Sequence, residues 1–211
     1  ISNCEPKSEA PKSFDEFMRN LFPLEAERQY MMEWLAVVCM RPQVRLRTSV
    51  ILRSIDEGVG KDVLIAKLIG KCMLGQKHFV GMSLRAAKSD FNGPLAGKRL
   101  VHVEEVYSKD STANANKLKA MVTNDDLLVN QKYEQQYTTA FFGISTNNKR
   151  PLILPAEDRR WFIPQIISKT FTDKEVSAKF FGALIDSFES GGAAQELGGY
   201  FEFICRDLEE K

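Results

Sequence analysis

The chain has 211 residues, a formal net charge of +1, and a balance of 44% hydrophobic and 27% charged residues that is ordinary for a globular protein. Because the chain is nearly neutral, any site for nucleic acid or phosphate has to be a local patch. No run of about 18 apolar residues is present, which argues against a membrane span, and the four scattered cysteines favour reduced thiols in a cytoplasmic protein.

The first part of the chain is predicted to be a linker followed by helices. Residues 1–13 are predicted to be a disordered linker because Pro, Ser and Glu dominate them. Residues 14–45 are predicted to be an N-terminal helical hairpin, because apolar residues recur at helical spacing on both sides of Pro23. Since the sequence begins at Ile1, without a Met, we expect it to be a fragment of a longer polypeptide.

The middle of the chain, residues 46–168, is predicted to be an α/β core. Its buried-strand candidates are TSVILRS, RLVHVEEV, TTAFFGIST and RRWFIPQI. Helical patterns such as residues 63–74 alternate with these strands, so we expect a mostly parallel sheet flanked by helices. DLLVNQKYEQQYT is predicted to be a polar hairpin. Residues 169–211 are predicted to be helical, with a hinge at SGGAAQELGG.

The first predicted strand leads into SIDEGVGKD, which has the layout of a phosphate-binding loop. Small residues let backbone N–H groups converge on phosphate oxygens, and a lysine and a helix N-terminus add positive charge. The loop departs from the usual pattern, because Ile55 replaces its opening glycine and Asp62 replaces its hydroxyl residue. The alternative is an ordinary strand-turn-helix corner. The predicted nucleotide-binding residues are Gly58, Val59, Gly60, Lys61 and Asp62.

Two acidic residues, Glu104 and Glu105, end the second predicted strand. In phosphate-loop ATPases such a strand lies beside the first strand, and its acids hold Mg²⁺ and activate the attacking water. Glu104 is then the metal-side acid and Glu105 the general base, while Asp62 is a second candidate metal ligand because Mg²⁺ favours carboxylate oxygen. The alternative is a solvated pair of acids after a strand.

Two further elements fit a site for ATP. Asn147 ends the third predicted strand, where its amide would orient water against a γ-phosphate; the alternative is a turn begun by the Asn pair. Arg159 or Arg160, beside the fourth strand, would reach the nucleotide of a neighbouring subunit as an arginine finger. The alternative for either arginine is a surface salt bridge with Asp158.

With these elements in this order, the chain resembles the superfamily-three helicases, related to the AAA+ fold, and more closely the ATPase domain of phage and plasmid primase-helicases. DFNGPLAGKRLVHVEEV and STNNKRPLILPAEDRRWF carry most of the resemblance. It implies a three-layer P-loop NTPase that binds ATP and Mg²⁺ and forms a hexameric ring that moves along single-stranded DNA. It also implies a fused or associated primase or polymerase domain, in the cytoplasm of a phage-infected or plasmid-bearing cell.

The resemblance also implies a basic residue on a β-hairpin that projects into the ring channel. Lys132 matches best, beside Tyr133 for base stacking, with Lys119 on the preceding helix as support. The alternative is a solvated polar hairpin. The expected function is an ATP-dependent DNA helicase or translocase module. The rival functions are a non-hydrolysing platform for oligomerisation and DNA binding, which the altered magnesium ligands suggest, and an ATPase that acts on protein.

Overall fold

The chain forms two compact units. The helical unit comprises residues 1–44, 58–75 and 168–211, and the sheet unit comprises residues 45–57 and 76–167. Among the residues described, no helix is both long and apolar enough to cross a membrane. The computed structural model describes residues 4–44, 46–87, 93–104, 111–123, 127–131, 134–138, 141–147, 158–165, 167–168 and 171–211.

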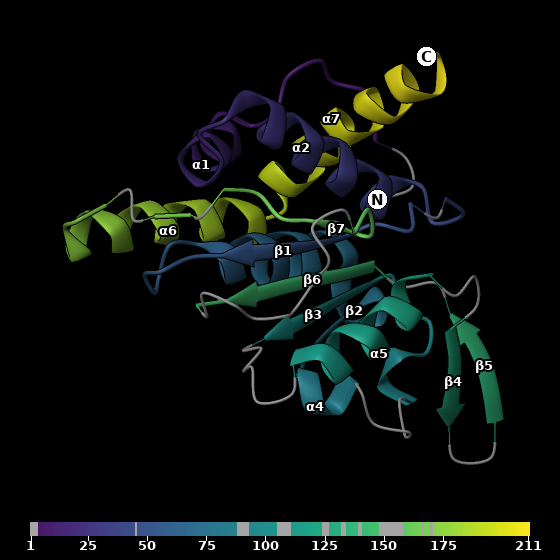
Figure 1. The fold of residues 1–211 in the computed structure, drawn as a ribbon. Helices are drawn as coiled ribbons and strands as arrows, with labels where there is room; N and C mark the ends of the chain where they lie inside the picture. Colours follow the sequence, from purple (N-terminus) through teal and green to yellow (C-terminus); the bar gives the residue numbers. More distant parts are fainter. Residues whose placement is uncertain are drawn as a thin grey trace. The chain divides into compact units, whose positions relative to one another are not determined.

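The sheet unit contains five parallel strands in the order β2-β3-β6-β1-β7 (Figure 1). All four strand pairs are parallel, which confirms the predicted α/β class and parallel sheet. The strands predicted from the sequence do not include β2, of which only the first residue is fully buried. The strands are β1 (Ser49–Arg53), β2 (Phe79–Ser83), β3 (Leu100–Glu104), β6 (Phe141–Thr146) and β7 (Trp161–Phe162).

One face of this sheet packs against helices of the same unit. These are α4 (Leu84–Ala87), the 3₁₀ turn η2 (Gly93–Leu95) and α5 (Ser111–Thr123). Side chains alternate between the two faces of a strand, so the apolar residues of this face recur at every second position. The strands contribute Ile51, Val101, Val103, Phe142 and Ile144, and the helices contribute Leu84, Leu95, Leu118, Met121 and Val122. Their burial holds α5 against the three central strands.

The strand order corrects one expectation. The strand that ends in Glu104, β3, does not lie beside β1, because β6 lies between them and pairs with both. All six residues of β6 are buried, whereas the last residues of β1 and β3 are not. A strand that is buried along its whole length suits the centre of a parallel sheet. The strand that leads to Asn147 is therefore the central one.

The backbone pairing of two strands confirms the predicted hairpin. β4 (Leu127–Gln131) and β5 (Glu134–Thr138) are antiparallel and form their own two-stranded sheet, apart from the five-stranded one (Figure 1). The sequence places Lys132 and Tyr133 between the two strands, and both lie outside the described residues.

The helical unit contains a pair of helices near each end of the chain. α1 has Pro11 as its N-cap. The expected hinge is short, because Gly191, with φ of 89°, interrupts the helix only once, and the buried Ala193 and Leu197 lie in the next helix. The helices are α1 (Lys12–Leu21), α2 (Glu25–Met40), α6 (Lys174–Glu189), α7 (Gly192–Glu209) and the π-helix η1 (Val63–Leu74). The short α3 (Gly75–His78) follows η1 at Gly75 and leads into the sheet unit.

The segment before α1 carries no helix or strand over residues 4–11, and it is bound to α7. The N–H of Lys7 donates a hydrogen bond of 3.1 Å to the carbonyl of Gly199. A β-carbon at Gly199 would lie 2.5 Å from the carbonyl oxygen of Glu5, so only glycine fits there. The backbone of residues 5–7 therefore lies against α7 rather than apart from the unit.

A charged cluster joins the end of α2 to α7. Arg41 Nη1 lies 2.6 Å from Glu202 Oε2, and Arg41 Nε lies 2.5 Å from Glu209 Oε1. The side chains of Arg41 and Glu202 are only 13% and 17% exposed, so this pair is shielded from solvent. The hydrogen bonds from Arg41 lower the pKa of Glu202, and burial only partly opposes them. The charged form of Glu202 therefore stabilises the fold.

We expect Arg41→Met to lower the free energy of unfolding by roughly 2 kcal/mol, because it leaves the Glu202 carboxylate partly buried without its main partner. Arg19→Met is the matched control, since Arg19 pairs with Asp15 at an exposed site, and it should change stability by less than about 0.5 kcal/mol. Urea denaturation at pH 7 measures both.

The pH dependence tests the same contact. Because the folded pKa of Glu202 is lowered, its contribution is complete above the unfolded value of about 4.3 and is lost as the pH falls through the folded pKa. The difference between wild type and Arg41→Met should therefore shrink in acid. Equal effects of the two arginine substitutions at pH 7 would contradict the structural importance of the cluster.

Candidate functional site

Three neighbouring strands of the sheet unit end in polar residues at the same edge. β1, β6 and β3 are parallel, so their carboxyl ends meet there, and the register pairs Arg53 with Thr146 and Ser145 with Glu104. Ligands of open α/β sheets bind in the crevice outside these strand ends. The polar side chains at the three ends are therefore the candidate functional groups of this unit.

Asn147 directly follows β6 and is held by the residue that directly follows β1. The Ser54 hydroxyl lies 3.0 Å from Asn147 Oδ1 and 2.6 Å from the carbonyl oxygen of Asp56, and the N–H of Ser54 donates to the carbonyl of Thr146. Asn147 is exposed, so its amide faces solvent at the point where the chain leaves β1. Sequence reasoning misses Ser54, although a small hydroxyl residue between a strand and a glycine turn is a usable signal.

Glu104 ends β3, next to the end of β6. Its side chain is 57% exposed, and its Oε1 lies 3.4 Å from Nδ1 of the buried His102. An exposed carboxylate at this edge suits a hard cation such as Mg²⁺, which is usually held by one or two carboxylates together with phosphate and water. Within the described residues, no three His, Cys, Asp or Glu side chains gather as a metal site. Glu105 lies outside those residues.

The two glycines of the predicted phosphate-binding loop belong to the helical unit. Gly58 and Gly60 have φ values of 73° and 106°, which side-chain-bearing residues rarely adopt. A β-carbon at Gly60 would also lie 2.8 Å from the Phe17 ring and 3.0 Å from the Phe181 ring. Gly60 is thus required by both its backbone conformation and its neighbours. The close approach of α1 and α6 holds the loop in place.

The two charged residues of the loop differ in exposure. Lys61 is only 5% exposed, whereas Asp62 is exposed at the start of η1. Asp62 occupies the N-cap position, but its side chain makes no capping hydrogen bond. If the segment is an ordinary strand-turn-helix corner, Asp62 only interacts favourably with the helix N-terminus. The observed position of Asp62 is compatible with that role. The exposed carboxylate equally permits the predicted role as a metal ligand.

A small pocket lies beside the loop within the helical unit. Phe171, Phe180 and Phe181 are half-buried, and their ring centroids lie 5.0 Å apart for Phe171 and Phe180 and 5.5 Å apart for Phe180 and Phe181. The pocket holds only about 10 Å³, which is room for a single water molecule and far too little for a nucleobase. Sequence reasoning misses this pocket, because it joins three distant segments. Its lining is Phe17, Asn20, Leu21, Gly58, Val59, Phe171, Ser177, Phe180 and Phe181.

The two candidate arginines, Arg159 and Arg160, differ in their contacts. Arg160 Nη1 lies 3.0 Å from Asp158 Oδ1, and Lys119 Nζ lies 3.2 Å from Asp158 Oδ2. The Asp158 side chain is 2% exposed, so this is an interior ion pair rather than a surface one. Arg159 is exposed, and its side chain makes no ion pair or hydrogen bond with the described part of the chain. Arg160 and Lys119 are therefore engaged inside the unit, and Arg159 faces outward.

Asp158 is charged in the folded protein. Burial by itself would raise its pKa, but hydrogen bonds from Arg160 and Lys119 outweigh burial and hold the pKa below its usual value. This three-residue cluster links α5 to the segment before β7 within the sheet unit. Its role is to fix the position from which Arg159 projects.

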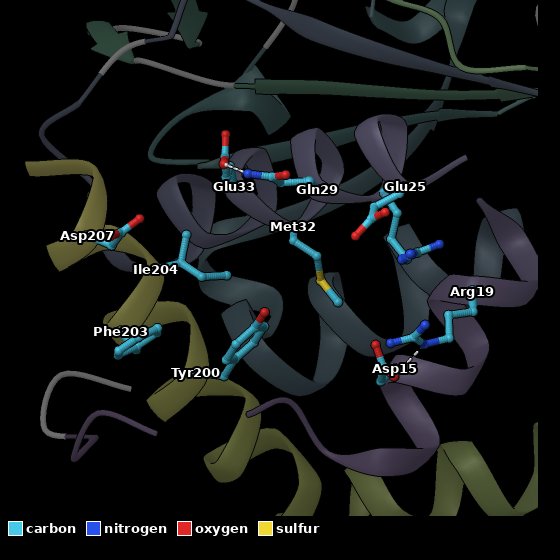
Figure 2. Close-up of a pocket in the computed structure, with 11 residues that line it drawn as sticks. Asp15, Arg19, Glu25, Gln29, Met32, Glu33, Tyr200, Phe203, Ile204 and Asp207 are labelled. Atoms are coloured by element: carbon cyan, nitrogen blue, oxygen red, sulfur yellow. Dashed lines mark hydrogen bonds and ion pairs between the residues drawn. The ribbon is translucent and has the colours of Figure 1, made fainter. Parts of the chain in front are cut away.

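A separate hollow of about 330 Å³ lies among α1, α2 and α7 (Figure 2). Its two arginines are engaged: Arg19 pairs with Asp15 at 2.7 Å, and Arg28 donates to the carbonyl of Phe22. Four carboxylates, those of Asp15, Glu25, Glu33 and Asp207, outnumber these arginines. Such a lining disfavours phosphate, so we do not place the nucleotide there.

Comparison with known families gives one match. The model of a family of unknown function, DUF5906, matches residues 52–160, slightly more than half of the chain. The matched range begins within β1 and ends at Arg160, and it includes the glycine loop, Glu104 and Asn147. No curated protein matches the sequence.

Comparison with solved structures finds the same fold in the C-terminal region of NrS-1. Three apo structures of that region match with TM-scores of 0.75, 0.77 and 0.78 and with 21%, 23% and 21% sequence identity. The matches extend over 94%, 93% and 99% of this chain and over 46%, 47% and 53% of the NrS-1 chains, in the same order. The chain thus spans about half the length of these neighbours, and the similarity shows a shared fold.

We expect Gly60→Ala to destabilise the protein by roughly 2–4 kcal/mol, because it combines a positive φ with a clash against two phenylalanine rings. Gly58→Ala is the control, since Gly58 also has a positive φ but a β-carbon added there would meet no atom within 4 Å. That substitution should cost only about 1–2 kcal/mol. Chemical denaturation of both variants gives the comparison, and equal losses would argue against the Phe17 and Phe181 contacts.

We expect Asp158→Asn to cost about 1–3 kcal/mol at neutral pH, because it removes a buried charge from two cationic partners. Since the folded pKa of Asp158 is lowered, this contribution is present above the unfolded pKa of about 3.9 and is lost as the pH falls through the folded pKa. Thermal unfolding from pH 7 to pH 3 measures it. Asp207→Asn, at an exposed pair with Lys211, is the control and should have little effect.

Proposed function

The chain belongs to the DUF5906 family, and on this premise we propose that it is an ATP-dependent helicase or translocase module of a phage-type primase-helicase, acting on single-stranded DNA. The observation that carries the proposal is the meeting of three strand ends, where Ser54 holds Asn147 and Glu104 ends the adjacent strand. The chain leaves β1 at this edge and enters the glycine loop. A parallel α/β sheet offers its ligand site at such an edge.

The residues present fit a nucleotide and its metal ion. The positive φ values of Gly58 and Gly60 allow the backbone turn that phosphate loops need, and Lys61 at the start of η1 supplies the positive charge. Mg²⁺, when bound, neutralises charge that develops on the phosphates. Glu104 and Asp62 are the carboxylates proposed to hold it.

Each remaining residue has a role that its position permits. Asn147 presents its amide at the central strand end, where it would orient the attacking water. Glu105 is proposed as the general base on the strength of the sequence alone. Arg159, rather than Arg160, is proposed as the residue that reaches the nucleotide of a neighbouring subunit, because Arg160 is held by Asp158.

The DNA contact is proposed for the β4–β5 hairpin. This hairpin forms a sheet of its own, and the sequence between its strands carries Lys132 and Tyr133, a cation and an aromatic ring that suit a phosphate and a stacked base. Lys119 contributes less in this proposal, because its ammonium group contacts Asp158. We propose the hexameric ring and the primase or polymerase partner because of the resemblance of the motifs. The fold shared with the NrS-1 region supports the α/β architecture of this proposal.

One observation favours a second function. Asp62 is exposed where a magnesium-binding hydroxyl is expected, and Glu57 is exposed in the same loop, so negative charge surrounds the phosphate position. This arrangement favours a weakened site on a platform that oligomerises and binds DNA without hydrolysis. Titration with a fluorescent ATP analogue separates the two functions. Tight Mg²⁺-dependent binding supports the ATPase, and no binding at millimolar nucleotide supports the platform.

We expect the protein to release phosphate from ATP, and single-stranded DNA to stimulate it. Lys61→Ala and Arg159→Ala should each reduce the rate at least tenfold, because each removes positive charge from the transferred phosphate. A mixture of the two variants should recover part of the activity, since a mixed ring contains sites that pair an intact Lys61 with the Arg159 of a neighbour.

The controls separate catalysis from folding and assembly. Arg160→Ala should lower stability through the loss of the Asp158 contact but keep ATPase activity of its own, so its mixture with Lys61→Ala should show no gain above the sum of the two variants. Size-exclusion chromatography with ATP and DNA checks that the variants still assemble. Near-zero rates for the wild type and every variant would refute the ATPase.

A further inference from the structure

His102 is a fully buried polar residue next to the strand-end site. It lies on β3 two residues before Glu104, so both side chains are on the same face of the strand. A buried polar side chain normally has hydrogen-bond partners, and its partners define what it does. The role of His102 is not explained by the apolar core on the opposite face of the sheet.

The neighbouring strands leave room for the imidazole ring. The sheet register pairs His102 with Gly81 on β2 and with Gly143 on β6, so neither neighbour has a side chain beside it. A β-carbon at Gly81 would lie 3.4 Å from Glu104 Oε1, which shows that this oxygen leans back over β2. One oxygen of the carboxylate is therefore turned toward the histidine, on a side chain that is otherwise largely exposed.

The contacts of the ring connect two strand ends. His102 Nε2 is hydrogen-bonded to Ser145 Oγ on β6, and His102 Nδ1 lies 3.4 Å from Glu104 Oε1. In the tautomer with its proton on Nδ1, the ring can donate to the Glu104 carboxylate and accept from the Ser145 hydroxyl at Nε2. A separation of 3.4 Å is long for a hydrogen bond, but such contacts often tighten when a ligand binds.

We propose that His102 is a positioning residue, which holds one oxygen of the Glu104 carboxylate over β2 so that the other faces the ligand edge of the sheet. The proposal rests on the proposed function, because the orientation of Glu104 affects the reaction only if the site takes Mg²⁺ and nucleotide. Partners of this kind orient ligating carboxylates and histidines in metal sites, and their loss typically reduces metal affinity or activity about 10- to 100-fold.

Two conservative substitutions separate the two contacts of the ring. His102→Asn keeps an N–H donor near the position of Nδ1 and so can still reach Glu104. His102→Gln keeps a donor near the position of Nε2, can reach Ser145, and loses the contact with Glu104. Both remove the ring, so they should have similar thermal stability. We expect kcat to stay within about threefold of wild type in His102→Asn and to fall at least tenfold in His102→Gln, with little change in KM for ATP.

Two measurements do not depend on hydrolysis. Binding of Mn²⁺ with a non-hydrolysable ATP analogue should weaken about tenfold in His102→Gln and much less in His102→Asn. In the unliganded wild type, long-range ¹H–¹⁵N NMR should place a proton on Nδ1 of His102. A proton on Nε2 alone, with a bare Nδ1 facing the carboxylate, would overturn the proposal even if a variant fails to fold.

The outcomes distinguish this inference from the proposed function. If wild type binds Mn²⁺ with nucleotide and both variants bind and hydrolyse alike, the inference is wrong and the ATPase stands. If wild type binds neither the metal nor the nucleotide, the proposed function and this inference fall together. Loss of metal affinity in His102→Gln with retention in His102→Asn supports the positioning role, whatever the rate of hydrolysis.

Discussion

The backbone pairing of β6 between β1 and β3 is the constraint on which the candidate site depends. It brings residues that are far apart in the sequence to one edge, since Arg53 pairs with Thr146 and Ser145 pairs with Glu104. Without it, Ser54 would not meet Asn147, and His102 would not meet Ser145. The polar contacts at the edge are thus consequences of sheet register, and a slip of one residue would turn every side chain of β6 to the other face.

The two glycines of the loop are fixed by the helical unit. The loop begins in one unit and ends in the other, because Glu57 belongs to the first and Gly58 to the second. Contacts of Gly60 with Phe17 and Phe181 tie the loop to α1 and α6. Changes in those helices are therefore expected to affect the loop directly.

Local patterns in the sequence predicted most elements, because they depend on periodicity and on turn residues. η1 coincides with residues 63–74, and Gly75 follows it with a φ of 71°. The position of β6 between β1 and β3 could not be predicted in this way, because strand order depends on pairing between distant segments rather than on local pattern. The two arginines are adjacent in the sequence, and only the buried Asp158 distinguishes them. Ser54 and His102 were missed for the same reason, since their importance arises from neighbours on other strands.

The late position of β6 in the chain also affects how the protein folds. β1 is apolar and buried, yet its two partners, β6 and β7, begin at Phe141 and Trp161. β2 and β3 are much closer together in sequence and can pair early. Long-range parallel pairing is slow, because the loop must close before the contacts form. During synthesis β1 therefore remains an unpaired, apolar strand until most of the chain has emerged. A truncation before β6 would leave β1 unpaired and prone to aggregation.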